Sequence, residues 1–561
     1  MDAILANSWG DRRPDGYDAV VVGSGYGGAI TAARLANAAV NPKLSVCILE
    51  RGQEWPVGEF PDNFGDVLGN SYNPVLNPLG LYEFDAFPDI AVIKGSGLGG
   101  TSLVNANVAI RPEPDVFATW PSALKQAAQI GETTPGSLWN YYKRAEETLE
   151  VSSHPTGSTL KKFQALKKRA SELGQFVETL PLAVNFQKEG VEVYKRNGGS
   201  IVKHRCIDCG DCVTGCNVGA KNTLYMNYLP LAKTGGAHMF TQAEVDYVER
   251  KDSQWVVHVT HRDDAISSED VTITARMVVL AAGALGSPRI LLRSRDEGLA
   301  TSAVLGSRFS GNGDFFGLAY NSSQFTDILG WGNHRKDPIA QVVRAGPSIV
   351  GLVRYNEKAP PGQRFVIEDL SIPRAYRDAA AAAFRILPGT VVGGQDSAQA
   401  QERLDKDILG ADPQGALNSS MLYLCMTQDD SGGTLSLDES GNVQVDWPGA
   451  GAEAIFKQVN QECLAHATAL GSYFIENPLW KASPWQTLIT AHPLGGCPMG
   501  EDGSDGAVDH LGRVFQGARD EVHPSLYVAD GSIVRTALGV NPFLTISALS
   551  ERIVDYIISG L

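Results

Sequence analysis

Residues 17–28, YDAVVVGSGYGG, decide the fold. The short apolar run Tyr17–Val22 is rich in β-branched residues and predicts a buried parallel strand. It is followed by Gly23, Gly25 and Gly28, which match the pattern G-x-G-x-x-G, and then by helix formers. In that pattern the glycines allow a tight turn, close approach of the backbone to a pyrophosphate, and contact between helix and strand. The stretch predicts a Rossmann-like nucleotide site, although an ordinary glycine-rich turn has the same glycines.

Two further stretches bear on which nucleotide binds. Residues 44–50, LSVCILE, predict a second strand with Glu50 at its end, where an acid binds a ribose hydroxyl. Residues 526–531, LYVADG, predict another strand, and Asn541-Pro542 has the residue types that begin a helix. A helix N-terminus there would stabilise the negative charge of a reduced flavin. An NAD site needs no such element, so the sequence favours FAD.

The composition excludes several classes of protein. The chain has 561 residues, of which 47 are basic and 63 acidic, a net charge of −16, and this argues against binding to nucleic acid. No uninterrupted run of 18 apolar residues occurs, so no transmembrane segment is expected. No secretory signal is visible at the N-terminus, and eight cysteines are too few for a disulfide scaffold. We therefore expect a cytoplasmic protein.

Several motifs, spread from end to end of the chain, match one family in its order. The chain resembles the glucose-methanol-choline (GMC) flavoprotein oxidoreductases, and within them the bacterial cholesterol oxidase branch with non-covalent FAD. The matching stretches are VVVGSGYGGAITAARL at 20–35, GSGLGGTSLVNANVAI at 95–110, AAGALGSPRILLRSRD at 281–296, HPLGGCPMG at 492–500 and LYVADGSIVRTALGVNPFLTISALSERI at 526–553.

The resemblance implies an α/β fold, α+β overall. A Rossmann-like FAD-binding domain is expected beside a substrate domain with a mainly antiparallel six-stranded sheet. Both domains are expected to be discontinuous: FAD-binding at 15–57, 220–306 and 505–561, and substrate-binding at 58–219 and 307–504. The substrate domain includes a cysteine-rich loop at 204–220 and an insertion at 372–420. The sterol oxidases have a shorter connection at the insertion, which is either a lid, an oligomer arm, a docking surface or a solvated decoration.

The resemblance also assigns site residues. For the ADP half of FAD these are Gly23, Gly25, Gly28, Glu50 and, through its backbone, Val245; along the pyrophosphate, ribityl chain and flavin they are Gly97, Gly100, Asn105, Asp530 and Phe543. His492 and Asn541 match the two active-site residues, and Glu368, in FVIEDLSIP, falls where the sterol oxidases carry a glutamate.

Alcohol oxidation explains these residue types. The hydroxyl must lose a proton while hydride moves to the flavin, and histidine is the side chain that titrates near neutrality, so His492 is the candidate base. Asn541 would hold the hydroxyl or the reduced flavin. Glu368, if buried, would have a raised pKa and could shuttle a proton, whereas a surface carboxylate beside Asp369 is the alternative.

Four cysteines lie within eleven positions: Cys206, Cys209, Cys212 and Cys216, spaced C-x2-C-x2-C-x3-C. This spacing is that of bacterial ferredoxins and predicts one [4Fe–4S] cluster, with Asn217 in place of the usual proline. Zinc sites usually pair two knuckles across a longer gap. The fourth ligand is either Cys216 or a distant cysteine, and the alternative is that the four are thiols or local disulfides.

The sequence therefore predicts an FAD-dependent enzyme that oxidises a hydrophobic primary or secondary alcohol to a carbonyl. Its electrons would pass to oxygen or, through a cluster, to an acceptor protein or quinone. Two alternatives stay open, because one fold hosts many functions: a non-redox or light-driven lyase or decarboxylase, and an electron-transfer flavoprotein.

Overall fold

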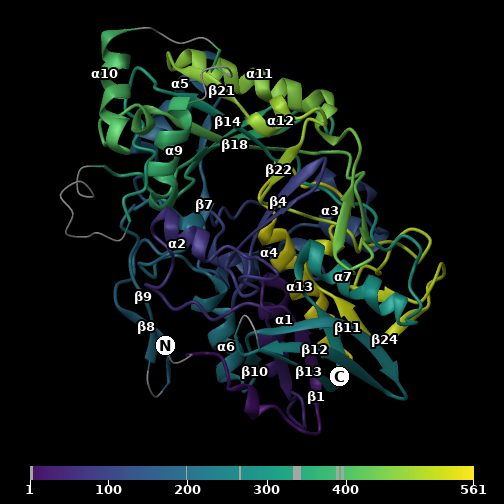
Figure 1. The fold of residues 1–561 in the computed structure, drawn as a ribbon. Coiled ribbons are helices and arrows are strands. Elements are labelled where there is room, and N and C mark those ends of the chain that lie inside the picture. Colours follow the sequence, from purple (N-terminus) through teal and green to yellow (C-terminus); the bar gives the residue numbers. More distant parts are fainter. Residues whose placement is uncertain (1–3, 197–198, 265–266, 333–342, 387–390, 393–396) are drawn as a thin grey trace.

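The computed structural model describes residues 4–196, 199–264, 267–332, 343–386, 391–392 and 397–561. Two large sheets dominate it. An eight-stranded sheet lies at one end of the molecule, near both termini, and a seven-stranded sheet lies at the other (Figure 1).

The eight-stranded sheet has a parallel centre. Strand β1 pairs in parallel with β2 on one side and β13 on the other, and β2/β10 and β13/β24 are also parallel. Val20, Val21 and Val22 are all buried, because helices cover both faces of the centre. The strands are β1 Tyr17–Val22, β2 Val46–Leu49, β10 His238–Phe240, β11 Ala243–Lys251, β12 Gln254–Arg262, β13 Ser268–Leu280, β23 Arg513–Phe515 and β24 Val522–Val528, with helices α1 Tyr26–Ala36, α6 Tyr228–Thr234, α7 Gly283–Asp296 and α13 Phe543–Ser559.

This sheet confirms the Rossmann-like half of the predicted fold class. It differs in one detail, since 271–274 and 277–282 suggest two strands while the structure has one long β13. Its first half pairs with β12 and its second half with β1, so Ala275 and Arg276 continue the strand through the change of partner.

The seven-stranded sheet is antiparallel at every pair. Six strands match the prediction, and the two-residue β17 from the insertion adds a seventh at one edge beside β21. In order across the sheet the strands are β17 Val391–Val392, β21 Tyr473–Glu476, β14 Phe315–Tyr320, β18 Met421–Thr427, β16 Phe365–Leu370, β15 Gly351–Tyr355 and β6 Val177–Thr179.

The two faces of this sheet have different neighbours. Leu352, Val366 and Leu424 belong to the same buried core as the Rossmann-like sheet. Ile367 and Tyr423 belong to a second core with helices α5 (Lys161–Glu172) and α11 (Ala454–Ala469), which cover the outer face (Figure 1). Side chains alternate along a strand, so the side chain of Glu368 lies on the same face as Val366, toward the Rossmann-like half.

Smaller elements complete the chain. The three-stranded sheet of β22, β4 and β3 delivers residue 492, which follows β22 by two positions. The stretch 58–89, expected to be an ordered loop, holds α2 and β3, and Phe64 of α2 lies against Tyr376 of α9 in the insertion. The remaining elements are β3 Tyr82–Ala86, β4 Ile90–Gly95, β22 Leu488–Thr490, β5 Ser152–Ser153, β7 Pro181–Leu182, β8 Val191–Arg196, β9 Gly199–Lys203, β19 Thr434–Leu437, β20 Val443–Asp446, α2 Phe64–Gly69, α3 Ser122–Gln129, α4 Leu138–Thr148, α9 Arg374–Ile386, α10 Ala398–Lys406 and α12 Pro478–Ala482.

The insertion at 372–420 is only partly described, because 387–390 and 393–396 lie outside the described residues. Its described part holds the helices α9 and α10, as the sequence predicts for 374–387 and 396–409. The domain boundaries remain predictions. No helix of the described part is both long enough and apolar enough to span a membrane.

Candidate functional site: a nucleotide cradle, a histidine–aspartate pair and a cysteine cavity

The first glycine loop joins β1 to α1. Gly23 has a φ of +91°, and a Cβ there would collide with the carbonyl oxygen of Ala281. A Cβ at Gly28 would collide with the carbonyl oxygen of Gly23, so this glycine lets helix and strand touch. A Cβ at Gly25, in contrast, would meet no atom within 4 Å. The protein itself therefore does not need glycine at 25, and the open space beside it fits a ligand.

Glu50 follows β2 and is buried, with 6% of its surface exposed. Its Oε2 accepts from the N–H and hydroxyl of Ser24, at 3.1 and 2.6 Å, and its Oε1 accepts from the N–H of Gly52 at 2.9 Å. Oε1 keeps a lone pair free for a ribose hydroxyl. The carbonyl oxygen of Glu50 accepts from Ala243 N–H at 2.8 Å, which brings β11 and Val245 to the same place.

The second glycine loop packs on the first. Ser24 Oγ accepts from Gly99 N–H at 2.9 Å, and a Cβ at Gly100 would lie 2.9 Å from Gly25 Cα. Gly97 and Gly100 both have positive φ, which only glycine adopts easily. The two loops thus form one cradle of backbone at the start of α1, where the N-terminus of the helix favours a phosphate.

Asn105, Asp530 and Phe543 border the cradle. The amide of Asn105 donates to Tyr26 Oη at 2.8 Å, and the ring of Tyr26 stacks on Phe543 with centroids 4.8 Å apart. Within the described part of the chain, Asn105 Oδ1 is buried without a hydrogen-bond partner. This orphaned acceptor and the open space at Gly25 fit a bound dinucleotide.

The side chain of Asp530 is already engaged by protein groups. Its Oδ2 accepts from Gly283 N–H at 2.8 Å and from the Ser287 hydroxyl, and its Oδ1 accepts from the N–H and hydroxyl of Ser532. Burial raises the pKa of Asp530, and these hydrogen bonds oppose the rise. Its carboxylate therefore joins the start of α7 to the turn after β24. The predicted contact of Asp530 with the cofactor would then be made by its backbone.

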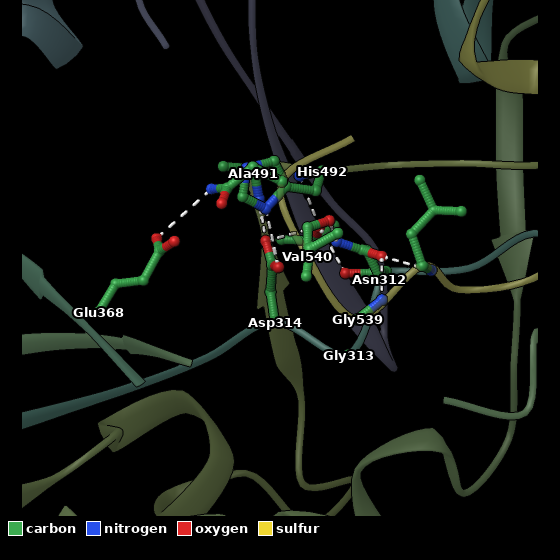
Figure 2. Close-up of polar contacts among 12 residues, drawn as sticks. Asn312, Gly313, Asp314, Glu368, Ala491, His492, Gly539 and Val540 are labelled. Atoms are coloured by element: carbon green, nitrogen blue, oxygen red, sulfur yellow. Dashed lines mark hydrogen bonds and ion pairs between the residues drawn. The ribbon is translucent and has the colours of Figure 1, made fainter. Parts of the chain in front are cut away.

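His492 lies between the two large sheets and is held by a residue that the sequence does not single out. Asp314, at the residue before β14, is fully buried, and its Oδ1 lies 2.9 Å from His492 Nδ1 (Figure 2). The other ring nitrogen, Nε2, has no hydrogen-bond partner among the described residues. His492 therefore has one ring nitrogen without a protein partner, as a base for a substrate hydroxyl requires.

Asn541 and Glu368 meet each other nearby. Asn541 Nδ2 donates to Glu368 Oε2 at 3.4 Å, and both residues are buried. Figure 2 labels Glu368 and marks this hydrogen bond with a dashed line. Over the described residues, Glu368 Oε1 and Asn541 Oδ1 are buried without partners. The structure thus places Glu368 inside, beside Asn541, and the surface alternative is wrong. These two oxygens could each bind a donor group of a substrate or cofactor.

The environment of Glu368 favours its neutral form. Burial raises the pKa of Glu368 well above its usual value; the hydrogen bond from Asn541 opposes this, and the carboxylates of Asp369 and Asp314 add to the rise. A protonated Glu368 carries a proton that it can donate to a neighbouring acceptor. Burial thus favours a Glu368 that can give a proton to another group of the site.

All four cysteines of the C-x2-C-x2-C-x3-C run line one small cavity. All are free, so the local-disulfide alternative is wrong, and no distant cysteine lines this cavity. Within the described ranges, no three His, Cys, Asp or Glu side chains are arranged to bind a single metal ion. A four-iron cluster has a different requirement, because each cysteine binds its own iron atom.

A buried cation lies against this cavity. Lys221 is 1% exposed, and its Nζ donates to the carbonyl oxygens of Cys212, Asn105 and Leu103 at 2.9, 2.6 and 3.1 Å. The N–H of Ala220 points at Cys216 Sγ, 3.4 Å away. A buried ammonium with neutral partners is costly, whereas a cluster held by four thiolates is anionic. The cavity, the cation and the N–H···S contact fit an iron–sulfur cluster.

The fold and the cradle together indicate a dinucleotide-binding protein with a second, antiparallel sheet. The family model GMC oxidoreductase matches residues 17–309 and 454–550. The chain belongs to the GMC oxidoreductase family, and the family implies FAD as its cofactor.

Relatives cover nearly the whole chain. A cholesterol oxidase of Mycobacterium tuberculosis (strain CDC 1551 / Oshkosh) is 27% identical, over 96% of this chain and 90% of its own. A cholesterol oxidase of Acinetobacter baumannii is also 27% identical, over 96% and 94%. A long-chain-alcohol oxidase of Arabidopsis thaliana is 26% identical, over 96% and 67%. The resemblance to the GMC family and its cholesterol oxidases is thereby confirmed.

Two solved structures show the same fold. Pyridoxine 4-oxidase from "Mesorbium loti" has a TM-score of 0.57 at 14% identity, covering 96% of this chain and 98% of its own. A formate oxidase from Aspergillus oryzae RIB40 has a TM-score of 0.61 at 13% identity, covering 98% and 99%. At these identities they establish the architecture alone, and they confirm the predicted fold class.

Gly25 offers a test of the cradle. In the variant Gly25→Ala the methyl group meets no protein atom, and the φ of −64° suits alanine, so folding and thermal stability should be unchanged. The methyl would occupy the space where a pyrophosphate approaches, so we expect FAD affinity to fall about tenfold or more in a fluorescence titration of the apoprotein. As a control, Gly69→Ala also places its methyl in open space, but far from the cradle, and should bind FAD normally. Equal FAD affinity in both variants would contradict the assignment.

Glu368 should make stability depend on pH. Above the ordinary range for a carboxyl group the unfolded chain releases this proton while the folded protein keeps it, so the free energy of unfolding falls as pH rises. Glu368→Gln has no such proton. We expect its melting temperature, relative to the wild type, to increase from pH 4.5 toward pH 8, whereas the exposed Glu357→Gln should follow the wild type. A parallel pH profile for Glu368→Gln would show that the buried carboxyl is ionised.

Proposed function

We propose that this GMC oxidoreductase oxidises a hydrophobic primary or secondary alcohol to the corresponding carbonyl compound, with non-covalent FAD. The observation that carries the proposal is a pair of neighbouring polar contacts: His492 with Asp314, and Asn541 with Glu368, whose pKa the Asp314 carboxylate helps to raise. The sterol and long-chain-alcohol substrates named for two relatives support the hydrophobic class.

The groups of this site divide the work of alcohol oxidation. Bound FAD supplies the acceptor for the hydride that leaves the carbinol carbon. His492 Nε2 accepts the hydroxyl proton, because Nδ1 is engaged by Asp314. Asn541, through its amide, holds the substrate oxygen, and neutral Glu368 holds a proton beside it. Glu368 and Asn541 are buried, so little bulk water reaches them during the transfer.

The electrons leave by one of two routes, to oxygen or to an external acceptor. We propose the second for this chain, with one [4Fe–4S] cluster bound by Cys206, Cys209, Cys212 and Cys216. Support comes from the common cavity, the buried Lys221 and the ferredoxin-like spacing. The acceptor would be a protein or a quinone. A cytoplasmic location, which suits cluster assembly, is part of the same proposal.

Anaerobic mixing with alcohols tests the function. Holoprotein titrated with a sterol, a long-chain alcohol or an aromatic alcohol should lose its flavin absorbance as carbonyl product forms, with two electrons taken up by flavin and cluster together for each product molecule. A lyase or decarboxylase would convert substrate without stoichiometric bleaching. An electron-transfer flavoprotein would be bleached by a donor protein and by no alcohol. Either result would refute the proposal.

A further inference from the structure

The five residues directly before β14, Ser310 to Asp314 (SGNGD), contact the chain segments of both His492 and Asn541. Asn312 and Gly313 both have positive φ, at +56° and +63°. This left-handed turn is accessible to exactly these residue types at modest cost. It allows the side chains of Asn312 and Asp314, two positions apart, to reach two different loops (Figure 2).

The hydrogen bonds of Asp314 determine which ring nitrogen of His492 carries the proton. Its Oδ2 accepts from the backbone N–H of Ala491 at 2.9 Å and from the Thr490 hydroxyl at 3.1 Å. Its Oδ1 lies 2.9 Å from His492 Nδ1. The carboxylate can only accept, so Nδ1 must carry the ring proton and Nε2 must be left as an acceptor. That is the tautomer a base needs.

Asn312 holds the loop that carries Asn541. Its Oδ1 accepts from the N–H groups of Leu538 and Gly539 at 2.8 and 3.2 Å, and its Nδ2 donates to the carbonyl oxygen of Val540 at 2.9 Å. The side chain is fully buried. Three bonds to consecutive residues fix this loop up to the residue before Asn541.

We propose that the segment 310–314 is a positioning clamp for the catalytic pair: Asp314 sets the tautomer and ring orientation of His492, and Asn312 sets the loop of Asn541. This inference rests on the proposed function and adds two positioning residues to it. The separation of His492 and Asn541 is then fixed by a short stretch of one chain, although the two are 49 positions apart in the sequence.

The variants Asp314→Asn and Asp314→Ala test the first half. In Asp314→Asn the amide oxygen must face the N–H of Ala491, which leaves the amide NH₂ against His492 Nδ1. The ring is then forced into the opposite tautomer, with Nε2 protonated and unable to accept a proton. Asp314→Ala leaves the ring free to adopt either tautomer. We expect Asp314→Asn to slow alcohol-driven flavin reduction about 10²- to 10⁴-fold, more than Asp314→Ala.

A purely structural role predicts the opposite order, because asparagine preserves shape and packing while alanine leaves a cavity. Melting temperature and FAD content, measured on both holoproteins, record that contribution separately. Asp314→Ala slower than Asp314→Asn would therefore overturn the first half of the proposal.

A tautomer measurement separates this inference from the proposed function. In protein with ¹⁵N-labelled histidine, the signal that disappears in His492→Gln identifies His492. It should report Nδ1–H in the wild type and Nε2–H in Asp314→Asn, whether or not an alcohol is turned over. An unchanged tautomer would refute the role of Asp314, while the correct tautomers without any alcohol reactivity would refute only the proposed function.

A double-mutant cycle tests the second half. Asn312→Ala should slow flavin reduction about tenfold or more in the wild-type background and have little further effect in an Asn541→Ala background, because it acts through Asn541. Additive losses in the two backgrounds would show that Asn312 supports the fold generally. The matched control is Asn356→Ala, an exposed asparagine on the far turn of the same sheet, which should leave the rate unchanged.

Discussion

His492→Ala will lose alcohol-driven flavin reduction by about 10²- to 10⁴-fold, the contribution usual for a positioned general base. His492 is the group in the described site that is held by a buried carboxylate on one side and open to a ligand on the other. Without it the hydroxyl proton loses its acceptor, since burial favours the protonated form of Glu368. The rate is measured by anaerobic stopped-flow, following flavin absorbance after mixing with a reactive alcohol.

The control for His492→Ala is His258→Ala, a histidine on β12 that pairs with Glu249 far from the cradle. FAD content should stay at the wild-type value in both variants, because no cradle residue changes. A His492→Ala protein that keeps FAD and is reduced at the wild-type rate would remove His492 from the mechanism. Loss of FAD from that variant would instead place the histidine in cofactor binding, contrary to the role assigned here.

The nucleotide half of the site was predictable because its signals are local. Gly23, Gly25 and Gly28 lie within six positions and directly after an apolar strand. This one stretch therefore contains the tight turn, the backbone that approaches the phosphates, and the glycine at which helix and strand touch. The candidate catalytic residues His492, Asn541 and Glu368 were found through the family resemblance. Asn541 and Glu368 form a hydrogen bond in the structure, but their spacing in sequence gives no physical reason for it.

Asp314 and Asn312 could not be predicted in this way. Asp314 meets His492 across 178 positions, and Asn312 meets Leu538 across 226, so no periodicity or spacing links them. The signal that was available is the sequence GNGD at 311–314, in which Asn and Gly permit a left-handed turn before a strand. Lys221 could not be predicted for the same reason. A lysine is usually exposed to solvent, and only the fold shows that Lys221 is buried.

The length of β13 and the seventh strand, β17, show a different limit. Strand boundaries depend on which partners are present, and β13 changes partner midway without a break in its own conformation. The two-residue β17 is too short to give a pattern of its own and exists because β21 offers it a free edge. Tertiary contacts decide such elements, and no local signal precedes them.

Cys212→Ser will abolish the iron–sulfur cluster while leaving the flavin in place. Cys212 is buried at the start of a short helical turn, with its carbonyl oxygen held by Lys221, so the nearly isosteric serine should preserve the loop. Serine is a poor ligand for iron in such a cluster, whose ligands are thiolates. Burial raises the pKa of Cys212, Cys206 and Cys209, so without metal these groups are neutral thiols and Lys221 loses its anionic counterpart.

The measurement is the iron-to-flavin ratio of protein purified without oxygen. The wild type should hold about four irons per FAD and show the low-temperature EPR signal of a reduced cluster after alcohol is added. Cys212→Ser should hold close to none, keep its FAD and still be bleached by alcohol, yet pass electrons to an external one-electron acceptor at least about tenfold more slowly. The control Cys47→Ala changes a buried cysteine of β2 that does not line the cavity, and its iron content should match the wild type.

Each outcome separates one part of the argument from another. Iron-free wild-type protein with full FAD would refute the cluster and leave alcohol oxidation with oxygen as the acceptor. Iron that alcohol does not reduce would assign the cluster to structure, since electrons from the flavin would not reach it. Iron that is reduced by alcohol in the wild type but lost in Cys212→Ser would support the proposed electron route. It would also explain why Lys221 is buried, because its charge then lies between an anionic cluster and the carbonyl of Asn105 at the cofactor cradle.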